Sequence, residues 1–548
     1  MRRICFGILF LLVISLGYGQ NRHENPKLVV GIVVDQMRRE YLDRFYDRFG
    51  EGGFKRMMKE GFDVRNGHYN YFPTVTGPGH ASVYTGTTPA VHGIIGNSWY
   101  DKGTKKSVNC VEDADYKVVG SPEGNGNVSP ARMLGTTVTD ELKLATQDRA
   151  KVIGISFKDR GAVLPSGHMA DGAYWYDGKS GTFVSSTYYV TQLSTWVQDF
   201  NKLGLADKYL NQEWSPLYPI GEYTRSGKDD SPYEERFSGM EKSTFPYDLK
   251  SIRKDNGDFG LLVSTPFGND LLTEFAKAAV NGENMGQGQT TDFLTVSFSS
   301  TDAVGHRLGP NAVEVEDMYL RLDKNIADLL QFLDQKIGQG KYLVFLTADH
   351  AVSNVAQELT DRKIPSGYFN SGKMHTDLKN YLSKFFPNKD LIENISNNQI
   401  IFNSALFDTN PRNSGIDFII ATELISRYLM TLDGVANVYT ESVLRNARYD
   451  EAGIKGMAVR GHHPTRSGNL VYVLEQGWYS SGNKQGTTHG SPYTYDTHVP
   501  ILFFGAGIKA GSSVRYHPVT DIAPTISMLL RIKFPSGCTG QPIAELFE

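Results

Sequence analysis

The chain has 548 residues, more than one simple hydrophobic core needs, so a large catalytic domain with insertions or two to four domains are expected. Hydrophobic residues make up 40% and charged residues 21%, which is ordinary for a globular protein. The formal net charge is only −4, which gives no reason to expect a nucleic-acid partner.

The first residues have the pattern of a secretory signal peptide. Two arginines precede an apolar stretch over residues 8–16, and Gly17-Tyr18-Gly19 is a small-x-small cleavage motif. We therefore expect residues 1–19 to be removed, which leaves residues 20–548. An uncleaved anchor is the alternative, but the apolar run is short for a membrane span. The sequence thus predicts a periplasmic or secreted protein with no membrane attachment after cleavage.

The cysteines allow one disulfide at most in the mature chain. Cys5 lies inside the predicted leader, so Cys110 and Cys538 remain. An oxidising compartment would permit a bridge between them, although the sequence does not show whether they meet in space. Neither lies in a zinc-ligand spacing with histidine, so we assign them no metal role.

Stretches typical of buried strands alternate with helical stretches along most of the chain. Strands are expected at 27–34, 151–157, 293–298, 342–346 and 500–504, and helices at about 39–60, 313–335, 416–431 and 521–530. This alternation is typical of α/β layers around a largely parallel sheet. Two stretches, at about 170–260 and 360–480, do not fit it, and we interpret them as insertions in one catalytic core.

Candidate metal ligands follow three of these strands. They are Asp35 after the first strand, Asp302 and His306 after the strand at 293–298, and Asp349 and His350 after the strand at 342–346. His489 completes a set of three Asp and three His. One Asp after one strand usually belongs to a turn, but three such groups at carboxyl ends indicate a site, because open α/β sheets bind ligands there. Carboxylate and imidazole ligands suit zinc, and three ligands per ion leave a position open for catalysis.

A hydroxyl group is available beside these ligands in the run Thr76-Gly77-Pro78-Gly79-His80. Thr76 precedes a plausible helix start, where the positive end of the helix dipole favours a phosphate. Threonine alone is a poor nucleophile, and coordination to zinc would lower its pKa. A simple helix cap is the alternative role for Thr76, but the metal ligands favour a nucleophile.

The segment 72–97 resembles the nucleophile motif of the alkaline phosphatase superfamily, in its nucleotide pyrophosphatase/phosphodiesterase-like branch. Thr76-Gly77-Pro78-Gly79-His80 matches the Thr-x-Pro-x-His of this branch. The motif that follows in the branch is Thr-Gly-x-x-Pro-x-x-His-Gly-Ile-x-x-Asn, and it is matched by Thr85-Gly86, Pro89, His92-Gly93-Ile94 and Asn97. Asp302-x-x-x-His306, Asp349-His350 and His489-Gly490 match the remaining motifs in order. The resemblance runs from about residue 26 to the C-terminus and implies an alkaline-phosphatase-like α/β/α sandwich with inserted subdomains.

The resemblance also implies how the ligands divide between two zinc ions. One ion would bind Asp35, Asp349, His350 and the Thr76 oxygen, and the other would bind Asp302, His306 and His489. Asn97 would donate its side-chain amide to a phosphoryl oxygen. We expect His80 and His92, which also belong to the motif, to be structural.

The branch contains diesterases and monoesterases, and Lys158 and Arg160 bear on the choice. Their i, i+2 spacing directly after the strand at 151–157 would put both on one side of an extended segment. Such a pair usually marks a solvated strand end, but this one resembles the Lys-x-Arg of the phosphate-irrepressible alkaline phosphatases of the PafA type. The resemblance implies that both side chains bind the terminal phosphate oxygens and stabilise their charge in the transition state.

These observations together predict a zinc-dependent alkaline phosphatase that hydrolyses small-molecule phosphate monoesters with broad specificity. A phosphothreonine intermediate would form, and inorganic phosphate would be the product. The alternative is a phosphodiesterase or nucleotide pyrophosphatase of the same superfamily. A sulfatase is less favoured because the Cys/Ser-x-Pro-x-Arg motif is missing, and a monomer is the favoured oligomeric state.

Overall fold

The computed structural model describes residues 25–121, 126–407 and 416–548, so the predicted leader at 1–19 lies outside the described residues. A ten-stranded sheet forms the centre of the fold. In spatial order its strands are β20 (Gly511–Pro518), β2 (Phe62–His68), β19 (His498–Gly505), β12 (Tyr342–Thr347), β1 (Leu28–Val34), β11 (Asp292–Phe298), β6 (Val152–Ser156), β7 (Gly172–Asp177), β8 (Thr182–Ser186) and β5 (Val118–Val119).

The middle of the sheet is parallel. Strands β12, β1, β11, β6 and β7 all run in one direction, and β19 is antiparallel to β12. Every residue of β1, β11 and β12 is buried, which explains why these strands are nearly continuous apolar runs. The predicted largely parallel sheet is confirmed, and so are the strands expected there.

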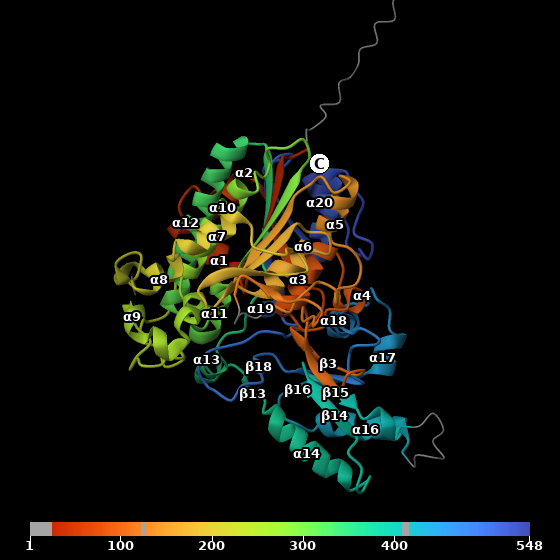
Figure 1. The fold of residues 1–548 in the computed structure, drawn as a ribbon. Helices are drawn as coiled ribbons and strands as arrows, with labels where there is room; N and C mark the ends of the chain where they lie inside the picture. The colour runs from red at the N-terminus through yellow and green to blue at the C-terminus, as the bar shows by residue number, and fades with distance from the viewer. Residues whose placement is uncertain (1–24, 122–125, 408–415) are drawn as a thin grey trace, which may run out of the picture.

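Helices cover both faces of the sheet, as an α/β/α sandwich requires (Figure 1). On one side lie α1 (Glu40–Arg44), α2 (Phe54–Glu60), α7 (Thr195–Lys202), α10 (Phe267–Gly282) and α12 (Val313–Leu333). On the other lie α3 (Thr76–Thr85), α5 (Val138–Ala145), α6 (Asp159–Ser166) and α20 (Ile522–Leu530). Helix α10 packs on α12, and α3 packs on α6. The helices expected at 313–335 and 521–530 are confirmed as α12 and α20.

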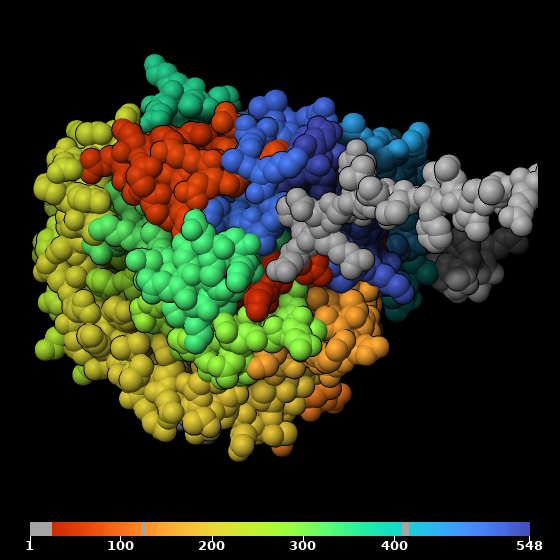
Figure 2. All heavy atoms as spheres, turned by 90° about the horizontal axis from the view of Figure 1, so that it is seen from above, coloured from red at the N-terminus to blue at the C-terminus, as the bar shows by residue number. Residues whose placement is uncertain are grey.

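Segments far apart in the sequence meet at the upper end of the sheet. The backbone N–H of Lys27 donates to the carbonyl of Lys341 over 2.8 Å, and Asn25 Nδ2 donates to the carbonyl of Leu530 over 3.4 Å. Figure 2 shows the red, green and blue segments side by side on this face. The first and last parts of the chain therefore belong to the same core.

The single helix expected at 39–60 is wrong. The structure has α1, a short 3-10 turn at Tyr46–Arg48, and then α2. Asp323 of α12 separates them, because its carboxylate accepts the backbone N–H of Gly50 (2.7 Å) and of Phe54 (2.8 Å). Phe54 is the first residue of α2, so a side chain from another helix accepts one of the N–H groups that the first turn of a helix leaves without an intrahelical partner.

The stretch at 170–260 is not wholly outside the core. Its first part forms β7 and β8 of the central sheet, where Tyr174 and Phe183 pack against Phe275 of α10. Aromatic residues in an alternating run favour such a strand, but the run is short and lies in a Tyr-rich sequence, so periodicity alone did not separate it. The part outside the sheet begins after Ser186.

The stretch at 360–480 contains a sheet of its own. Its order is β14 (Ile392–Ser396), β15 (Gln399–Phe402), β17 (Leu470–Leu474) and β16 (Val435–Thr440), and helices α14 (Ser371–Ser383) and α16 (Phe418–Leu429) pack with it around a separate hydrophobic cluster. Figure 1 shows these elements together below the central sheet. The helix expected at 416–431 is confirmed as α16.

Both cysteines of the described chain are free thiols. Cys110 lies beside the start of α3, because its sulfur would be 3.1 Å from a Cβ added to Gly77. Cys538 lies beside the other end of this helix, because its sulfur would be 2.7 Å from a Cβ added to Gly86. Ten helical residues span about 15 Å, far beyond the reach of a disulfide. The bridge that an oxidising compartment would permit is therefore not formed.

Among the described residues, no helix is both long enough and apolar enough to cross a bilayer.

Candidate active site

Three acidic residues converge at the carboxyl ends of neighbouring strands. Asp35 follows β1, Asp302 lies in α11 (Ser300–Leu308) after β11, and Asp349 follows β12. All three are buried, with exposed fractions of 0%, 6% and 0%. Strand β1 lies between β12 and β11, so later strands are added to the sheet on both sides of it. Open α/β sheets bind ligands at such a switch point, beyond the carboxyl ends of the strands.

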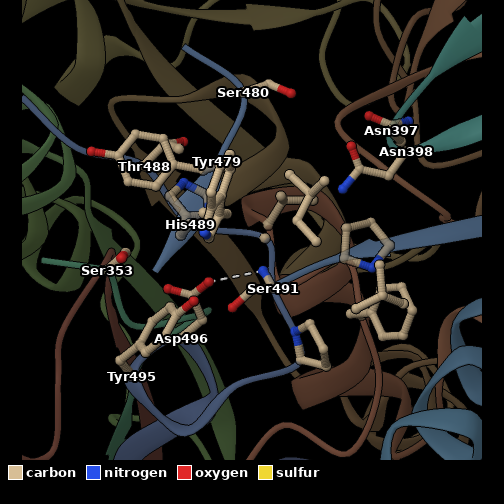
Figure 3. Close-up of a pocket in the computed structure, with 18 of the residues that line it drawn as sticks. Ser353, Asn397, Asn398, Tyr479, Ser480, Thr488, His489, Ser491, Tyr495 and Asp496 are labelled. Atoms are coloured by element: carbon tan, nitrogen blue, oxygen red, sulfur yellow. Dashed lines mark hydrogen bonds between the residues drawn. The ribbon is translucent and has the colours of Figure 1, made fainter. Parts of the chain in front are cut away.

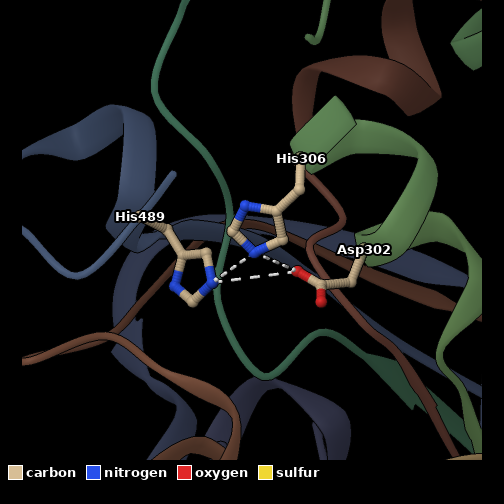
Figure 4. A group of neighbouring side chains, drawn as sticks. All are labelled: Asp302, His306 and His489. Atoms are coloured by element: carbon tan, nitrogen blue, oxygen red, sulfur yellow. Dashed lines mark hydrogen bonds and ion pairs between the residues drawn. The ribbon is translucent and has the colours of Figure 1, made fainter. Parts of the chain in front are cut away.

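Asp302, His306 and His489 form the first group of candidate ligands, with their polar atoms directed at one another (Figure 4). Asp302 Oδ1 lies 3.1 Å from His306 Nε2 and 3.7 Å from His489 Nε2, and the two Nε2 atoms are 3.2 Å apart. His306 Nδ1 contacts the carbonyl of Thr487 at 2.8 Å, and His489 Nδ1 contacts the carbonyl of Thr74 at 2.7 Å. A carbonyl only accepts, so each Nδ1 carries a proton and each Nε2 is the nitrogen that faces Asp302 and could bind a metal.

Asp35, Asp349 and His350 form the second group. His350 Nε2 lies 3.4 Å from Asp35 Oδ1 and 3.5 Å from Asp349 Oδ2. Its Nδ1 donates to the carbonyl of Ala351 at 3.0 Å, so Nε2 again carries a lone pair. Asp35 Oδ1, Asp349 Oδ2 and His350 Nε2 are all buried without a hydrogen-bond partner. Asp302 also lies within ligand distance of Asp35 and His350, so the two groups adjoin.

The electrostatics of these groups suit a cation. Burial and the neighbouring Asp35 raise the pKa of Asp349 well above its usual value. Burial likewise lowers the pKa of His350 to about 3, which keeps this imidazole neutral. Without a cation, a proton on Asp349 relieves the repulsion among these groups, and a positive ion among them would allow both carboxylates to be charged. The donor atoms belong to carboxylates and imidazoles, which are common metal ligands. A backbone carbonyl holds the other nitrogen of each imidazole, as is usual for histidines that bind a metal.

Lys158 lies between the two groups of ligands. Its Nζ donates to Asp35 Oδ2 and to Asp302 Oδ2, each at 2.6 Å. Burial acts to lower the Lys158 pKa, but the charges of Asp302 and Asp35 outweigh it and raise the pKa. The expected extended geometry of the basic pair is wrong, because α6 begins at Asp159 and Lys158 is its N-cap residue. Arg160 therefore lies in the first helical turn, with Nε buried and unpartnered and its side chain 20% exposed.

Thr76 is the first residue of α3 and is 1% exposed. Its segment touches both groups of ligands. The carbonyl of Thr74 holds His489, and Gly79 packs so closely on Asp349 that an added Cβ would lie 2.2 Å from the Asp349 carbonyl oxygen. Asn97 Oδ1 accepts the N–H of Gly77 at 2.6 Å, which leaves the Asn97 amide N–H groups oriented beside the start of the helix.

The two motif histidines outside the ligand groups have structural contacts. His80 Nδ1 donates to the carbonyl of Thr76 at 2.9 Å, and its Nε2 accepts from Ser297 at 2.8 Å. His92 Nδ1 accepts from the N–H of Ile94, and its Nε2 lies 2.9 Å from Ser82 Oγ. Burial lowers the pKa of His80 to about 4 and that of His92 to about 3, so both are neutral.

Gln36 is a site residue that the sequence patterns did not reveal. It is buried, it has a φ of 66°, and its backbone N–H donates to Asp349 Oδ1 at 3.2 Å. Its Nε2 donates to Asp302 Oδ1 at 2.7 Å. Gly305 makes room for this amide, since an added Cβ would lie 1.9 Å from Gln36 Oε1. One residue thus orients a carboxylate of each ligand group, and only its position after Asp35 could have drawn attention to it.

Two cavities border the histidines. One of about 180 Å³ lies beside His489 and includes Asn397, Tyr479 and Tyr495 (Figure 3). Asp496 closes this side by accepting the N–H of Ser491 at 2.8 Å, which fixes the loop that carries His489. The other cavity, of about 300 Å³, lies beside His306 and is lined largely by polar residues, among them Glu235 and Arg307. Both expected insertions therefore contribute walls beside the site.

Comparison with known proteins places this geometry in a family. The model of the type I phosphodiesterase/nucleotide pyrophosphatase family matches residues 29–498. The chain is 46% identical to alkaline phosphatase PhoV of Synechococcus elongatus over 95% of this chain and 93% of the relative. It is 44% identical to a Myroides odoratus protein described as a calcium-transporting ATPase, over 96% and 95%. It is 42% identical to alkaline phosphatase PafA of Elizabethkingia meningoseptica over 98% of both chains.

A solved structure of wild-type PafA superimposes with a TM-score of 0.91 at 42% identity, covering 96% of this chain and 99% of that one. A solved PafA variant replaces one Thr, one Asn, one Lys and one Arg, which are the residue types expected here around the phosphoryl group. The chain belongs to the type I phosphodiesterase/nucleotide pyrophosphatase family, among its PafA-type alkaline phosphatases. The resemblance predicted from the motifs is confirmed.

The role of Gln36 can be tested by its effect on metal affinity. Gln36→Ala removes the amide that holds Asp302 Oδ1, so the affinity for a metal ion should fall about 10–100-fold. Competition with a chromophoric chelator measures this affinity. Gln212→Ala is the control, because Gln212 is exposed and its amide donates to the carbonyl of Lys208, away from the candidate ligands. Equal affinity in both variants would show that Asp302 keeps its orientation without Gln36.

Proposed function

We propose that this protein is an alkaline phosphatase that hydrolyses phosphate monoesters through a covalent phosphothreonine intermediate. The observation that carries the proposal is the position of Thr76. It starts α3 between Thr74, whose carbonyl holds His489, and Gly79, which packs on Asp349. Lys158 contacts Asp35 and Asp302, and Asn97 contacts the N–H of Gly77. The identity to PhoV and PafA over nearly the whole chain supports the same activity.

The residues present fit two zinc ions. We propose that Asp35, Asp349, His350 and the Thr76 oxygen hold one ion and that Asp302, His306 and His489 hold the other. When bound, such ions lower the pKa of an adjacent hydroxyl and stabilise charge on attacking and leaving oxygens. The remaining chemistry belongs to the side chains.

The reaction would proceed by two displacements at phosphorus. Thr76 Oγ attacks in line with the leaving oxygen, the bond from phosphorus to that oxygen breaks, and phosphothreonine forms with release of the alcohol. Water then attacks the phosphothreonine from the opposite side and releases inorganic phosphate and the Thr76 hydroxyl. The N-terminus of α3 and the Asn97 amide would stabilise the phosphoryl oxygens in both steps.

Lys158 and Arg160 would set the preference for monoesters. A monoester carries one more negative charge than a diester, so two cationic side chains stabilise it more. We assign the leaving group to the cavity beside His306, which is lined largely by polar residues. Few directed contacts there would give broad specificity for small-molecule phosphate monoesters.

A phosphodiesterase is the second candidate, because the matching family model describes phosphodiesterases and nucleotide pyrophosphatases. The two candidates differ in the ratio of rates on p-nitrophenyl phosphate and bis-(p-nitrophenyl) phosphate. A much higher rate on the diester would favour the second candidate. We also propose, from the N-terminal sequence pattern, that the protein is exported to the periplasm or the medium. A monomer stays the favoured oligomeric state.

Replacement of the nucleophile is the direct test of the intermediate. Thr76→Ala should lower kcat at least about a thousandfold while the protein keeps its metal, because no other hydroxyl replaces the attacking atom. Thr76→Ser should retain measurable turnover, and Thr85→Ala, at the far end of α3, should remain near wild type. Steady-state kinetics with metal analysis measures both effects. A near-normal rate in Thr76→Ala would move the nucleophile elsewhere, first to Thr74.

Replacement of both Lys158 and Arg160 by Ala should slow monoester hydrolysis roughly a hundredfold or more, and diester hydrolysis much less. The physical reason is the additional charge of the monoester. Since Lys158 also contacts Asp35 and Asp302, metal content should be measured on the same preparation. Equal losses on the two substrates with normal metal content would contradict a role in substrate choice.

Removal of metal should abolish hydrolysis, because the ligand atoms would then lack the cation that stabilises transition-state charge. Dialysis against a chelator followed by zinc addition should remove and then restore the activity, with about two zinc ions bound per chain at full rate. Elemental analysis and p-nitrophenyl phosphate assays on the same samples provide the measurement. Full activity in metal-free protein would refute the zinc-dependent mechanism.

A further inference from the structure

The first turn of α3 combines the proposed nucleophile with two glycines. Gly77 and Gly79 follow Thr76, and glycine gives a backbone more conformational freedom than any other residue does. Close packing nevertheless requires them. A Cβ on Gly79 would lie 2.2 Å from the carbonyl oxygen of Asp349, and a Cβ on Gly77 would lie 3.1 Å from Cys110 Sγ. The backbone is therefore flexible at the place where the attacking oxygen has to be held still.

The peptide unit that joins Thr76 to Gly77 has a side-chain contact at each of its polar ends. Asn97 Oδ1 accepts the Gly77 N–H at 2.6 Å, and His80 Nδ1 donates to the Thr76 carbonyl at 2.9 Å. This N–H is one of the four that the start of a helix leaves without an intrahelical partner. Because a peptide unit is planar, contacts at both ends restrict its rotation and with it the orientation of Thr76.

His80 is itself held by the central sheet. Its side chain is fully buried, and its Nε2 accepts from Ser297 Oγ at 2.8 Å. A neutral imidazole has one donor and one acceptor, so both of its polar atoms are engaged. Ser297 belongs to β11, which pairs with β1 on one side and with β6 on the other. A strand in the rigid middle of the sheet therefore orients the ring that contacts the Thr76 carbonyl.

The same part of the sheet supports the helix that follows the basic pair. Ser297 of β11 is paired with Ser156 of β6. Gly161 of α6 packs against both serines, since an added Cβ would lie 2.9 Å from Ser297 Oγ and 2.5 Å from Ser156 Oγ. Ser156 Oγ also accepts the N–H of Lys158 at 3.0 Å. The starts of α3 and α6 thus share one support, which fixes the proposed nucleophile relative to Lys158.

We propose that His80 is a positioning residue for Thr76. Together with Asn97 it fixes the peptide unit after Thr76 and so holds the Thr76 hydroxyl in line with phosphorus, a role that rests on the proposed function. Its ring transfers no proton, because both nitrogens are engaged in the contacts above. A misplacement of about 1 Å can slow a reaction roughly a hundredfold, so a residue without substrate contact still affects the rate.

Two competing explanations for the burial of His80 make different predictions. One is that the ring only fills space in the core. The other is that it acts on Asp349, whose Oδ2 lies 3.5 Å from His80 Nδ1. A packing role depends on side-chain volume, and a role toward Asp349 affects metal binding. Positioning of Thr76 depends on the donor at Nδ1 and affects kcat.

His80→Leu and His80→Asn separate these explanations. Leucine fills similar space without a donor, whereas the asparagine amide reaches the place of Nδ1 and can donate to the Thr76 carbonyl. His80→Leu should lower kcat on p-nitrophenyl phosphate about a hundredfold, with metal content and the inhibition constant of inorganic phosphate unchanged. His80→Asn should keep most of the wild-type kcat. The proposal is overturned if kcat is equal in the two variants or lower in His80→Asn, or if His80→Leu loses its metal.

Ser297→Ala tests the proposal even if His80→Leu does not fold. It removes the hydroxyl that orients the ring of His80, so kcat should fall about tenfold. Ser82→Ala is the matched control and should keep the wild-type kcat. Ser82 Oγ lies 2.9 Å from Nε2 of His92, a second buried histidine, whose Nδ1 accepts from the N–H of Ile94. Equal kcat in Ser297→Ala and Ser82→Ala would overturn the proposal.

The wild type distinguishes this failure from failure of the proposed function. A wild-type protein that hydrolyses no phosphoester would refute the proposed function and the role of His80 with it. An active wild type with no difference between the paired variants would refute the role of His80 alone.

Discussion

The position of β1 between β11 and β12 is the constraint on which the rest of the site depends. It directs three parallel strands at one point and leaves an aspartate at or just beyond the end of each. Two like charges about 4 Å apart repel by roughly 4 kcal/mol at the effective dielectric of a partly buried protein site. Three buried carboxylates are therefore favourable only where a proton or positive charge neutralises them, and the raised pKa of Asp349 reflects this. The apolar strands bury the three carboxylates, and their burial creates the need for neutralising charge. A metal ion is one way to supply that charge.

Lys158 meets part of this requirement with a charge from the protein itself. Its ammonium contacts one acid from each ligand group. A phosphate monoester bound between the groups would compete with these carboxylates for the same ammonium. In the proposed mechanism Lys158 would couple charge balance in the site to substrate charge, so a loss of activity on its removal would have two causes. Arg160 pairs with Asp159 at 3.6 Å, and among the described residues its contacts include no ligand carboxylate.

The sequence was sufficient for the features that depend on strand order and on side-chain type. Asp35, Asp302 and Asp349 stand at strand ends, and the intervening elements are long enough for their periodicity to be clear. The sequence was insufficient for features that depend on contacts with distant parts of the chain or on backbone conformation. Asp323 divides the helix expected at 39–60 from a distance of about 270 positions in the chain. Gln36 acts through a backbone conformation with positive φ, which its residue type does not indicate.

The partners of the ligand histidines explain the remaining gap between motif and site. His306, His350 and His489 each give their Nδ1 proton to a backbone carbonyl, of Thr487, Ala351 and Thr74. A carbonyl has no sequence signature, yet it determines which nitrogen faces the metal. The motif residues supply the ligands, and the path of the backbone supplies their orientation. Close agreement of this backbone with that of PafA, at a TM-score of 0.91, is therefore stronger support for a working metal site than shared motifs alone.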